Sequence, residues 1–126
     1  MTLQATIEQS LNKLENWIES HEYKGYDPAD GLESYLRPLT FGNLFLDRLL
    51  QQLIWRSPIN IRPILGVKPK DSFIARGYMA SGYLLQHKMT GNETYKTKAL
   101  ECLEYLKKNK APGFEEYCWG KTHDFA

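Results

Sequence analysis

Long hydrophobic runs are missing from this sequence, since no apolar stretch approaches the roughly 20 residues needed to span a bilayer. The first residues carry an acid early and lack the apolar segment of a signal peptide, so we expect a cytoplasmic protein without a membrane partner. An excess of one charge is also missing, because 16 Lys and Arg face 15 Asp and Glu. This balance argues against a nucleic-acid partner, which usually requires a clustered basic excess.

Cysteine and histidine are scarce. Cys102 and Cys118 have no metal-ligand spacing; Cys102 falls on an apolar helix face, and a reducing compartment disfavours a disulfide. The three histidines, His21, His87 and His123, share no metal spacing either. Phosphate-binding glycine loops, dinucleotide fingerprints, zinc-protease motifs and nucleophile elbows are absent from the sequence. We therefore expect no metal and no cofactor.

Helical periodicity dominates what the sequence does contain. Apolar residues recur every three or four positions in four stretches, which predicts an all-α fold. The expected helices span residues 3–20, 40–56, 72–89 and 93–109. Gly91 and Asn92 separate the last two by a tight break, so these helices should form an antiparallel hairpin. The length of 126 residues suits one domain, 1–126.

Three features predict how the helices pack. The broad apolar surface of helix 40–56 predicts packing on more than one side. Gly77 and Gly82 each cost about 1 kcal/mol relative to Ala inside a helix, which predicts a closely approaching neighbour. The connection 57–71 is rich in proline and in aliphatic residues, so it should be pinned against the protein. Its Arg62 either pairs with a loop acid or faces solvent.

Two long aromatic loops, residues 22–40 and 111–126, interrupt the helical pattern. In the first loop, Asp27 and Asp30 are either turn and cap residues, with Asp30 capping a short turn over 31–35, or a pair of carboxylates at the mouth of a site. In the second loop, His123 beside Asp124 is either an ordinary packed residue, a ligand pair or an acid–base pair. Aromatic residues in such loops either wedge helices apart or stack on sugars and peptides.

Four segments in combination resemble a known group. They are GYDPADGLES at 25–34, NIRPILGV at 60–67, the hairpin at 82–109 and YCWGKTHDF at 117–125. Together they resemble the N-terminal portion of bacterial six-hairpin glycosidase-like, (α/α)6 toroid proteins, in particular members encoded with surface-polysaccharide genes. Such proteins arrange helical hairpins in a ring with a carbohydrate-binding cleft at one mouth, and they include glycoside hydrolases, polysaccharide lyases and sugar epimerases.

The resemblance implies a saccharide partner and a set of binding residues, without assigning an acid, a base or a nucleophile. These residues are Tyr26, Asp27 and Asp30 in the first loop and Trp119, His123 and Asp124 in the last. A toroid of about twelve helices needs roughly 300 residues, whereas four helices are expected here. The chain is thus either the N-terminal third of a toroid or a small stand-alone relative.

A chain that forms only part of a ring of helices has two consequences for function. Apolar helix faces would lack partners, which predicts a homo-oligomer, such as a homodimer, or missing C-terminal helices. Catalysis by the chain alone is not expected, because a glycosidase needs two carboxylates flanking the bond. We therefore predict a carbohydrate-related helical domain whose loops 22–40 and 111–126 form a saccharide-binding face. The alternatives are a helical protein–protein interaction module, although no repeat near 34 residues is present, and a self-associating remnant.

Overall fold

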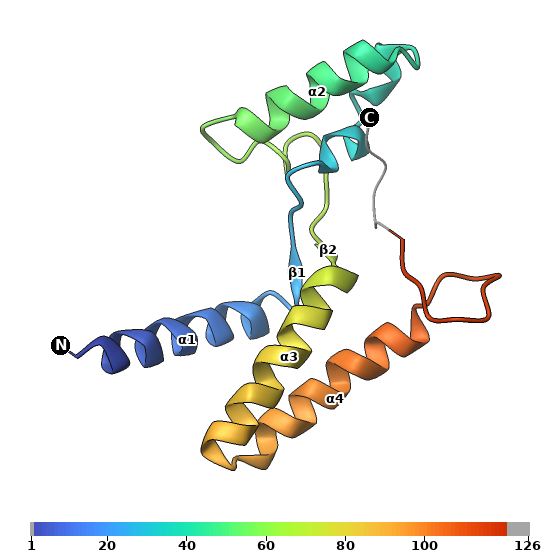
Figure 1. Ribbon diagram of the computed structural model, residues 1–126. Helices are drawn as coiled ribbons and strands as arrows, with labels where there is room; N and C mark the ends of the chain where they lie inside the picture. Colours follow the sequence, from blue (N-terminus) through green and yellow to red (C-terminus); the bar gives the residue numbers. More distant parts are fainter. Residues whose placement is uncertain (1, 121–126) are drawn as a thin grey trace.

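Figure 1 shows the chain as a computed structural model, which describes residues 2–120. The elements are α1 (Leu3–Ser20), β1 (Lys24–Gly25), the 3₁₀ helices η1 (Asp30–Glu33) and η2 (Arg37–Thr40), α2 (Leu44–Arg56), β2 (Lys70–Asp71), α3 (Phe73–Thr90) and α4 (Glu93–Lys108). The predicted all-α fold is confirmed, since each strand is only two residues long. Among the described residues, no helix combines the length and hydropathy required to cross a bilayer.

Side-chain caps begin three of the helices close to the boundaries expected from the sequence. Thr2, Ser72 and Asn92 each accept a hydrogen bond from a backbone amide in the first turn that follows, at the starts of α1, α3 and α4. Gly91 ends α3 with a φ of 68°, a left-handed conformation that costs glycine little. These local signals explain why the predicted helix ends agree with the observed ones to within one residue.

The second helix begins later than predicted. Thr40 belongs to η2, where its hydroxyl donates to the Arg37 carbonyl at 2.7 Å. Phe41 follows with a φ of 52°, and this left-handed backbone cannot continue into an α-helix. The α-helix therefore starts after Asn43, whose side chain accepts hydrogen bonds from the Phe45 and Leu46 amides.

The predicted antiparallel hairpin of α3 and α4 is confirmed, and it contains the main hydrophobic cluster. Ala80 and Tyr83 of α3 meet Ala99 and Cys102 of α4, and both Ala99 and Cys102 are completely buried. The expectation that Cys102 lies in the core is thus confirmed. Three of these four residues, Ala80, Ala99 and Cys102, are small, which lets the two helices approach closely.

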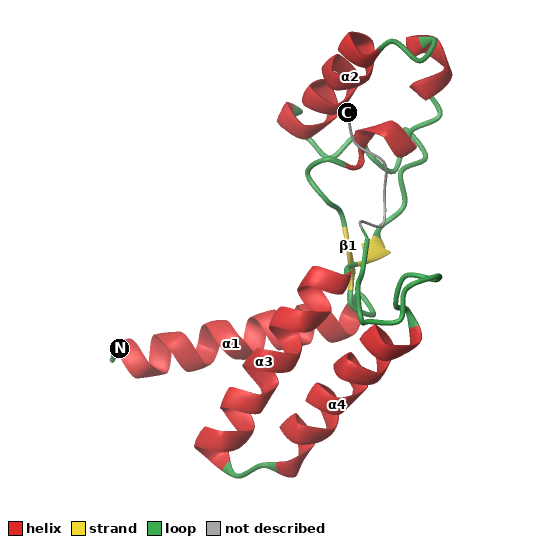
Figure 2. Cartoon of the chain, turned by 45° about the vertical axis from the view of Figure 1, so that its right-hand side comes forward, coloured by secondary structure: helices red, strands yellow, loops and turns green. Residues whose placement is uncertain are grey.

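Two lobes are joined by a short antiparallel ribbon, as Figures 1 and 2 show. We call α1, α3 and α4 the helical lobe, and α2 with η1 and η2 the α2 lobe. In the ribbon, Lys24 of β1 lies opposite Asp71 of β2, and Gly25 lies opposite Lys70. The sequence does not predict this ribbon, because strands of two residues carry no alternating pattern.

The α2 helix packs differently from the prediction. Within residues 2–120 its buried residues, Asp47, Gln51 and Ile54, form one face that contacts η1 and η2, so packing on several sides is a wrong prediction. Gly31 of η1 fits closely against this face, since an added Cβ would lie 2.9 Å from the Gln51 Cα. The Gln51 amide also donates to the Ala29 carbonyl at 3.0 Å. The apolar side of α2 consequently faces outward.

The connection 57–71 is pinned as predicted. Val67 is 2% exposed, and the Tyr35 amide donates to the Leu65 carbonyl at 3.2 Å. The prediction for the helical glycines is wrong, however. In the described part of the chain, a Cβ added to Gly77 or Gly82 would have no neighbour within 4 Å. Neither glycine marks a close helix crossing.

Candidate functional site

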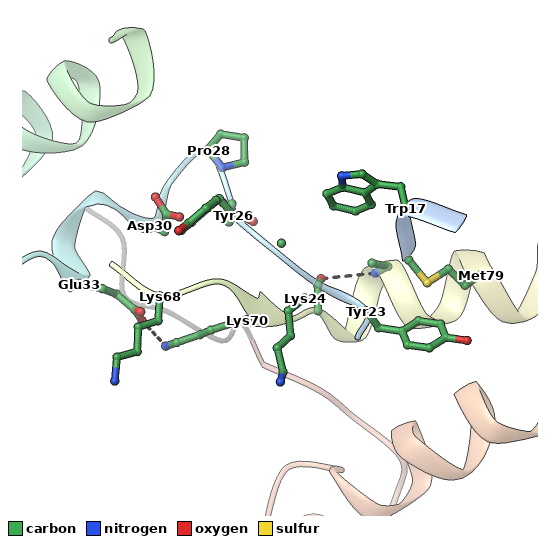
Figure 3. Close-up of a pocket in the computed structure, with 14 residues that line it drawn as sticks. Trp17, Tyr23, Lys24, Tyr26, Pro28, Asp30, Glu33, Lys68, Lys70 and Met79 are labelled. Atoms are coloured by element: carbon green, nitrogen blue, oxygen red, sulfur yellow. Dashed lines mark hydrogen bonds and ion pairs between the residues drawn. The ribbon is translucent and has the colours of Figure 1, made fainter. Parts of the chain in front are cut away.

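A pocket of about 250 Å³ lies beside the ribbon, between the two lobes (Figure 3). We call it the inter-lobe pocket. Its charged and aromatic lining residues are Trp17, Tyr23, Lys24, Tyr26, Asp27, Asp30, Glu33, Lys68 and Lys70. The structure therefore brings together three of the six predicted site residues, Tyr26, Asp27 and Asp30.

The first loop holds its aspartates by turn chemistry. The Asp27 carboxylate accepts from the Ala29 amide at 2.8 Å, and the Asp27 carbonyl accepts from the Asp30 amide at 3.2 Å. Pro28 lies between them and favours the turn by fixing its own φ. The turn interpretation of Asp27 is thus correct, and the same turn places both residues at the pocket.

Asp30 does not cap η1, contrary to one of the two interpretations, because that helix has no side-chain cap. The Asp30 carboxylate instead accepts a hydrogen bond from the Arg62 Nε at 2.8 Å. The side chains of Arg62 and Asp30 are 13% and 6% exposed, so this ion pair is nearly buried. Arg62 also donates to the Asp27 carbonyl and lies 5.7 Å from the Tyr26 ring centre. The expected pairing of Arg62 with a loop acid is confirmed. Among the described residues, the second Asp30 oxygen, Oδ2, is buried without a hydrogen-bond partner.

Charges of both signs line the pocket. Lys70 pairs with Glu33, and Lys68 adds a further exposed ammonium group (Figure 3). Lys24 donates to Glu22 at 2.7 Å, a hydrogen bond that raises the pKa of Lys24 and lowers the pKa of Glu22. The pocket thus offers ammonium donors and carboxylate acceptors close together.

Trp17 supplies an aromatic wall from the end of α1. It is 50% exposed, and it stacks on His21 with ring centres 4.2 Å apart. The His21 Nδ1 lies 2.8 Å from the Trp17 carbonyl, so the helix end fixes the pair. In the sequence, Trp17 lies near the end of the expected helix 3–20, and its position just before the first aromatic loop is the signal that could have indicated the site.

Arg76 holds a second aromatic residue of the pocket, Tyr23, in place. Its guanidinium donates to both oxygens of Asp71 at 2.6–3.0 Å and lies 3.7 Å from the centre of the Tyr23 ring. The same guanidinium lies 4.6 Å from the centre of the Tyr105 ring. Burial lowers the pKa of Arg76, but the hydrogen bonds to Asp71 and Cys102 raise it by a larger amount. The pKa of Arg76 therefore lies above its ordinary value. The charge is therefore permanent.

Trp119 of the last loop does not line the inter-lobe pocket. Its indole donates to the Leu106 carbonyl at 2.8 Å, and the ring lines a separate hollow beside Ile74 and Tyr78 of α3. His123 and Asp124 lie outside the described residues, so their predicted roles stay predictions. Within residues 2–120, no group of three potential ligands could hold a metal ion.

Aromatic faces beside hydrogen-bonding carboxylates and ammonium groups can bind a small polar ring, since sugars present apolar CH faces and hydroxyl edges. The chain matches no family model, no curated protein and no solved structure in comparisons with each. The resemblance to the toroid group therefore stays a prediction from sequence.

Proposed function

We propose that this protein is a carbohydrate-binding helical domain whose saccharide lies in the inter-lobe pocket. The observation that carries the proposal is the meeting of the exposed Trp17 and Tyr26 rings with the exposed Lys68 ammonium group at this pocket. Ring faces pack on the CH groups of a sugar, and charged side chains beside them bind its hydroxyl groups.

The size of the pocket favours one sugar unit. Its volume of about 250 Å³ lies below the ~300–1,000 Å³ of typical small-molecule pockets. His21 covers one face of Trp17, but Trp17 and Tyr26 remain 50% and 37% exposed, so ring surface is available for stacking on CH groups. Longer saccharides would extend from the pocket into solvent.

Binding is favoured over catalysis by the carboxylates themselves. Asp27 accepts from a backbone amide, Asp30 from Arg62, and Glu33 from Lys70. Each acid therefore already has a structural partner, whereas glycosidic cleavage needs one carboxyl group free to give up a proton and a second to act as base or nucleophile.

Titration calorimetry with neutral and uronate-containing oligosaccharides tests the proposal. We expect saturable binding with a panel member, weakened at least about tenfold by Trp17→Ala because a stacking face is lost. Trp55→Ala is the matched control, since Trp55 is similarly exposed at 54% but lies on α2. The proposal fails if no saccharide binds, or if both tryptophan variants bind as well as the wild type.

A further inference from the structure

Lys68 differs from the other lysines of the inter-lobe pocket in its contacts. Lys70 pairs with Glu33. Lys24 pairs with Glu22 at 2.7 Å. Within residues 2–120, no ion pair joins Lys68 to an acid, and its side chain is exposed. Its ammonium group is therefore available to a ligand of the pocket.

Two further acids of the pocket are engaged by the protein itself. The Asp30 carboxylate accepts from Arg62 at 2.8 Å, in an ion pair that is nearly buried. The Asp27 carboxylate accepts from the Ala29 amide at 2.8 Å, within its own turn. These carboxylates hold the walls of the pocket, whereas Lys68 presents its charge to the space between them. A positive charge of this kind favours a ligand that carries a negative one.

The local backbone directs Lys68 outward. A residue that precedes proline is disfavoured in the helical region, and Pro69 follows Lys68. Val67, one residue earlier, is 2% exposed and anchors the segment in the protein. Side chains alternate along an extended segment, so Lys68 lies opposite the buried Val67. Figure 3 shows the ammonium groups of Lys68 and Lys70 on the same side of β2.

We propose that the inter-lobe pocket selects an acidic saccharide, and that Lys68 determines this preference by binding an anionic substituent of the sugar. The inference rests on the proposed function and names the class of saccharide. A lysine ammonium group is a compact point charge with three N–H donors, so a carboxylate and a sulfate are both suitable partners. The ring surfaces of Trp17 and Tyr26 pack on the CH groups of the same ligand.

Titration calorimetry with three oligosaccharides of equal length tests the preference. The probes are a neutral glucose oligomer, a sulfated glucose oligomer and a glucuronate oligomer. We expect at least one acidic oligomer to bind about two- to fivefold more tightly than the neutral one, which is the range for an ion pair with an exposed lysine. This difference should disappear in about 1 M salt, where the Debye length is only ~3 Å.

Variants of Lys68 give the sharpest readout, which is the ratio of the acidic to the neutral affinity. Lys68→Gln should lower this ratio to about one, because the charge is lost. Lys68→Arg keeps the charge and should keep the preference. Lys13→Gln is the matched control, because Lys13 is also exposed but lies on α1 and does not line the pocket. Its ratio should equal that of the wild type.

The outcomes separate this inference from the proposed function. If the neutral oligomer binds as tightly as both acidic ones, the acidic class is wrong, although the saccharide site stands. A preference that persists in Lys68→Gln, or that Lys13→Gln also removes, would overturn the role of Lys68. If none of the three oligomers binds, the proposed function fails and this inference fails with it.

Discussion

At the scale of single residues, two arginines organise the molecule. Arg62 ties the connection 57–71 to the first loop through Asp30, and Arg76 ties α3 to β2 through Asp71. In both ion pairs each side chain is less than 15% exposed, so removal of one partner would leave a nearly buried charge. Asp30 of the first pair lines the inter-lobe pocket.

Tyr83 gives a prediction about pH. Burial, aided by the nearby Tyr23, raises the pKa of Tyr83 well above its ordinary value of 10.0. The folded chain then keeps a proton that the unfolded chain releases, so stability is complete below pH 10 and falls as the pH rises further. Urea unfolding at several pH values above 10 should show the free energy of unfolding decline. In Tyr83→Phe the slope of this decline should be smaller by about 1.4 kcal/mol per pH unit.

Tyr78→Phe serves as the control for that measurement, because Tyr78 lies on the same helix but is 77% exposed. Its pH profile should follow the wild type. A Tyr83→Phe profile that also follows the wild type would contradict the argument from burial. Lys98 acts in the same direction: burial lowers its pKa, but hydrogen bonds to Glu15 and Glu19 raise it more. Some decline should therefore remain in Tyr83→Phe.

At the scale of elements, the local signals of the sequence were sufficient for the helices. Capping side chains and Gly91 define the ends of α1, α3 and α4, and these residues act on backbone groups within one turn. The start of α2 and the β1–β2 ribbon could not be predicted in this way. The first depends on the left-handed Phe41, and the second on pairing between residues far apart in the chain.

The candidate site was predictable to the same extent. Tyr26, Asp27 and Asp30 stand out because one turn brings them together. Trp17 and Lys68 join them only through the folding of α1 and of the connection onto that turn, and no local pattern indicates this meeting. Sequence reasoning therefore identified one wall of the pocket and missed the others.

Two glycines test how the elements pack. Gly77→Ala should raise the free energy of unfolding by about 1 kcal/mol, because alanine is the better helix former and the added Cβ meets open space. Gly31→Ala should lower it by about 1–3 kcal/mol, because the Cβ would lie 2.9 Å from the Gln51 backbone. Urea denaturation measures both. A destabilising Gly77→Ala would instead indicate a close neighbour at that position.

At the scale of the whole molecule, the two lobes differ in how much core each contains. The α2 lobe buries few large apolar side chains, chiefly Leu32 and Ile54 with Val67 of the connection, and it shows an apolar stripe to solvent. The helical lobe holds the α3–α4 cluster. Because the ribbon between the lobes pairs only two residues of each strand, their stabilities should be weakly coupled within one chain.

Native-state hydrogen exchange would reveal this difference between the lobes. Amides of α2 should exchange faster than those of α3 and α4, because the smaller core opens more readily. Equal exchange rates in α2 and in the α3–α4 hairpin would contradict the weak coupling of the two lobes, because they would indicate that both open together.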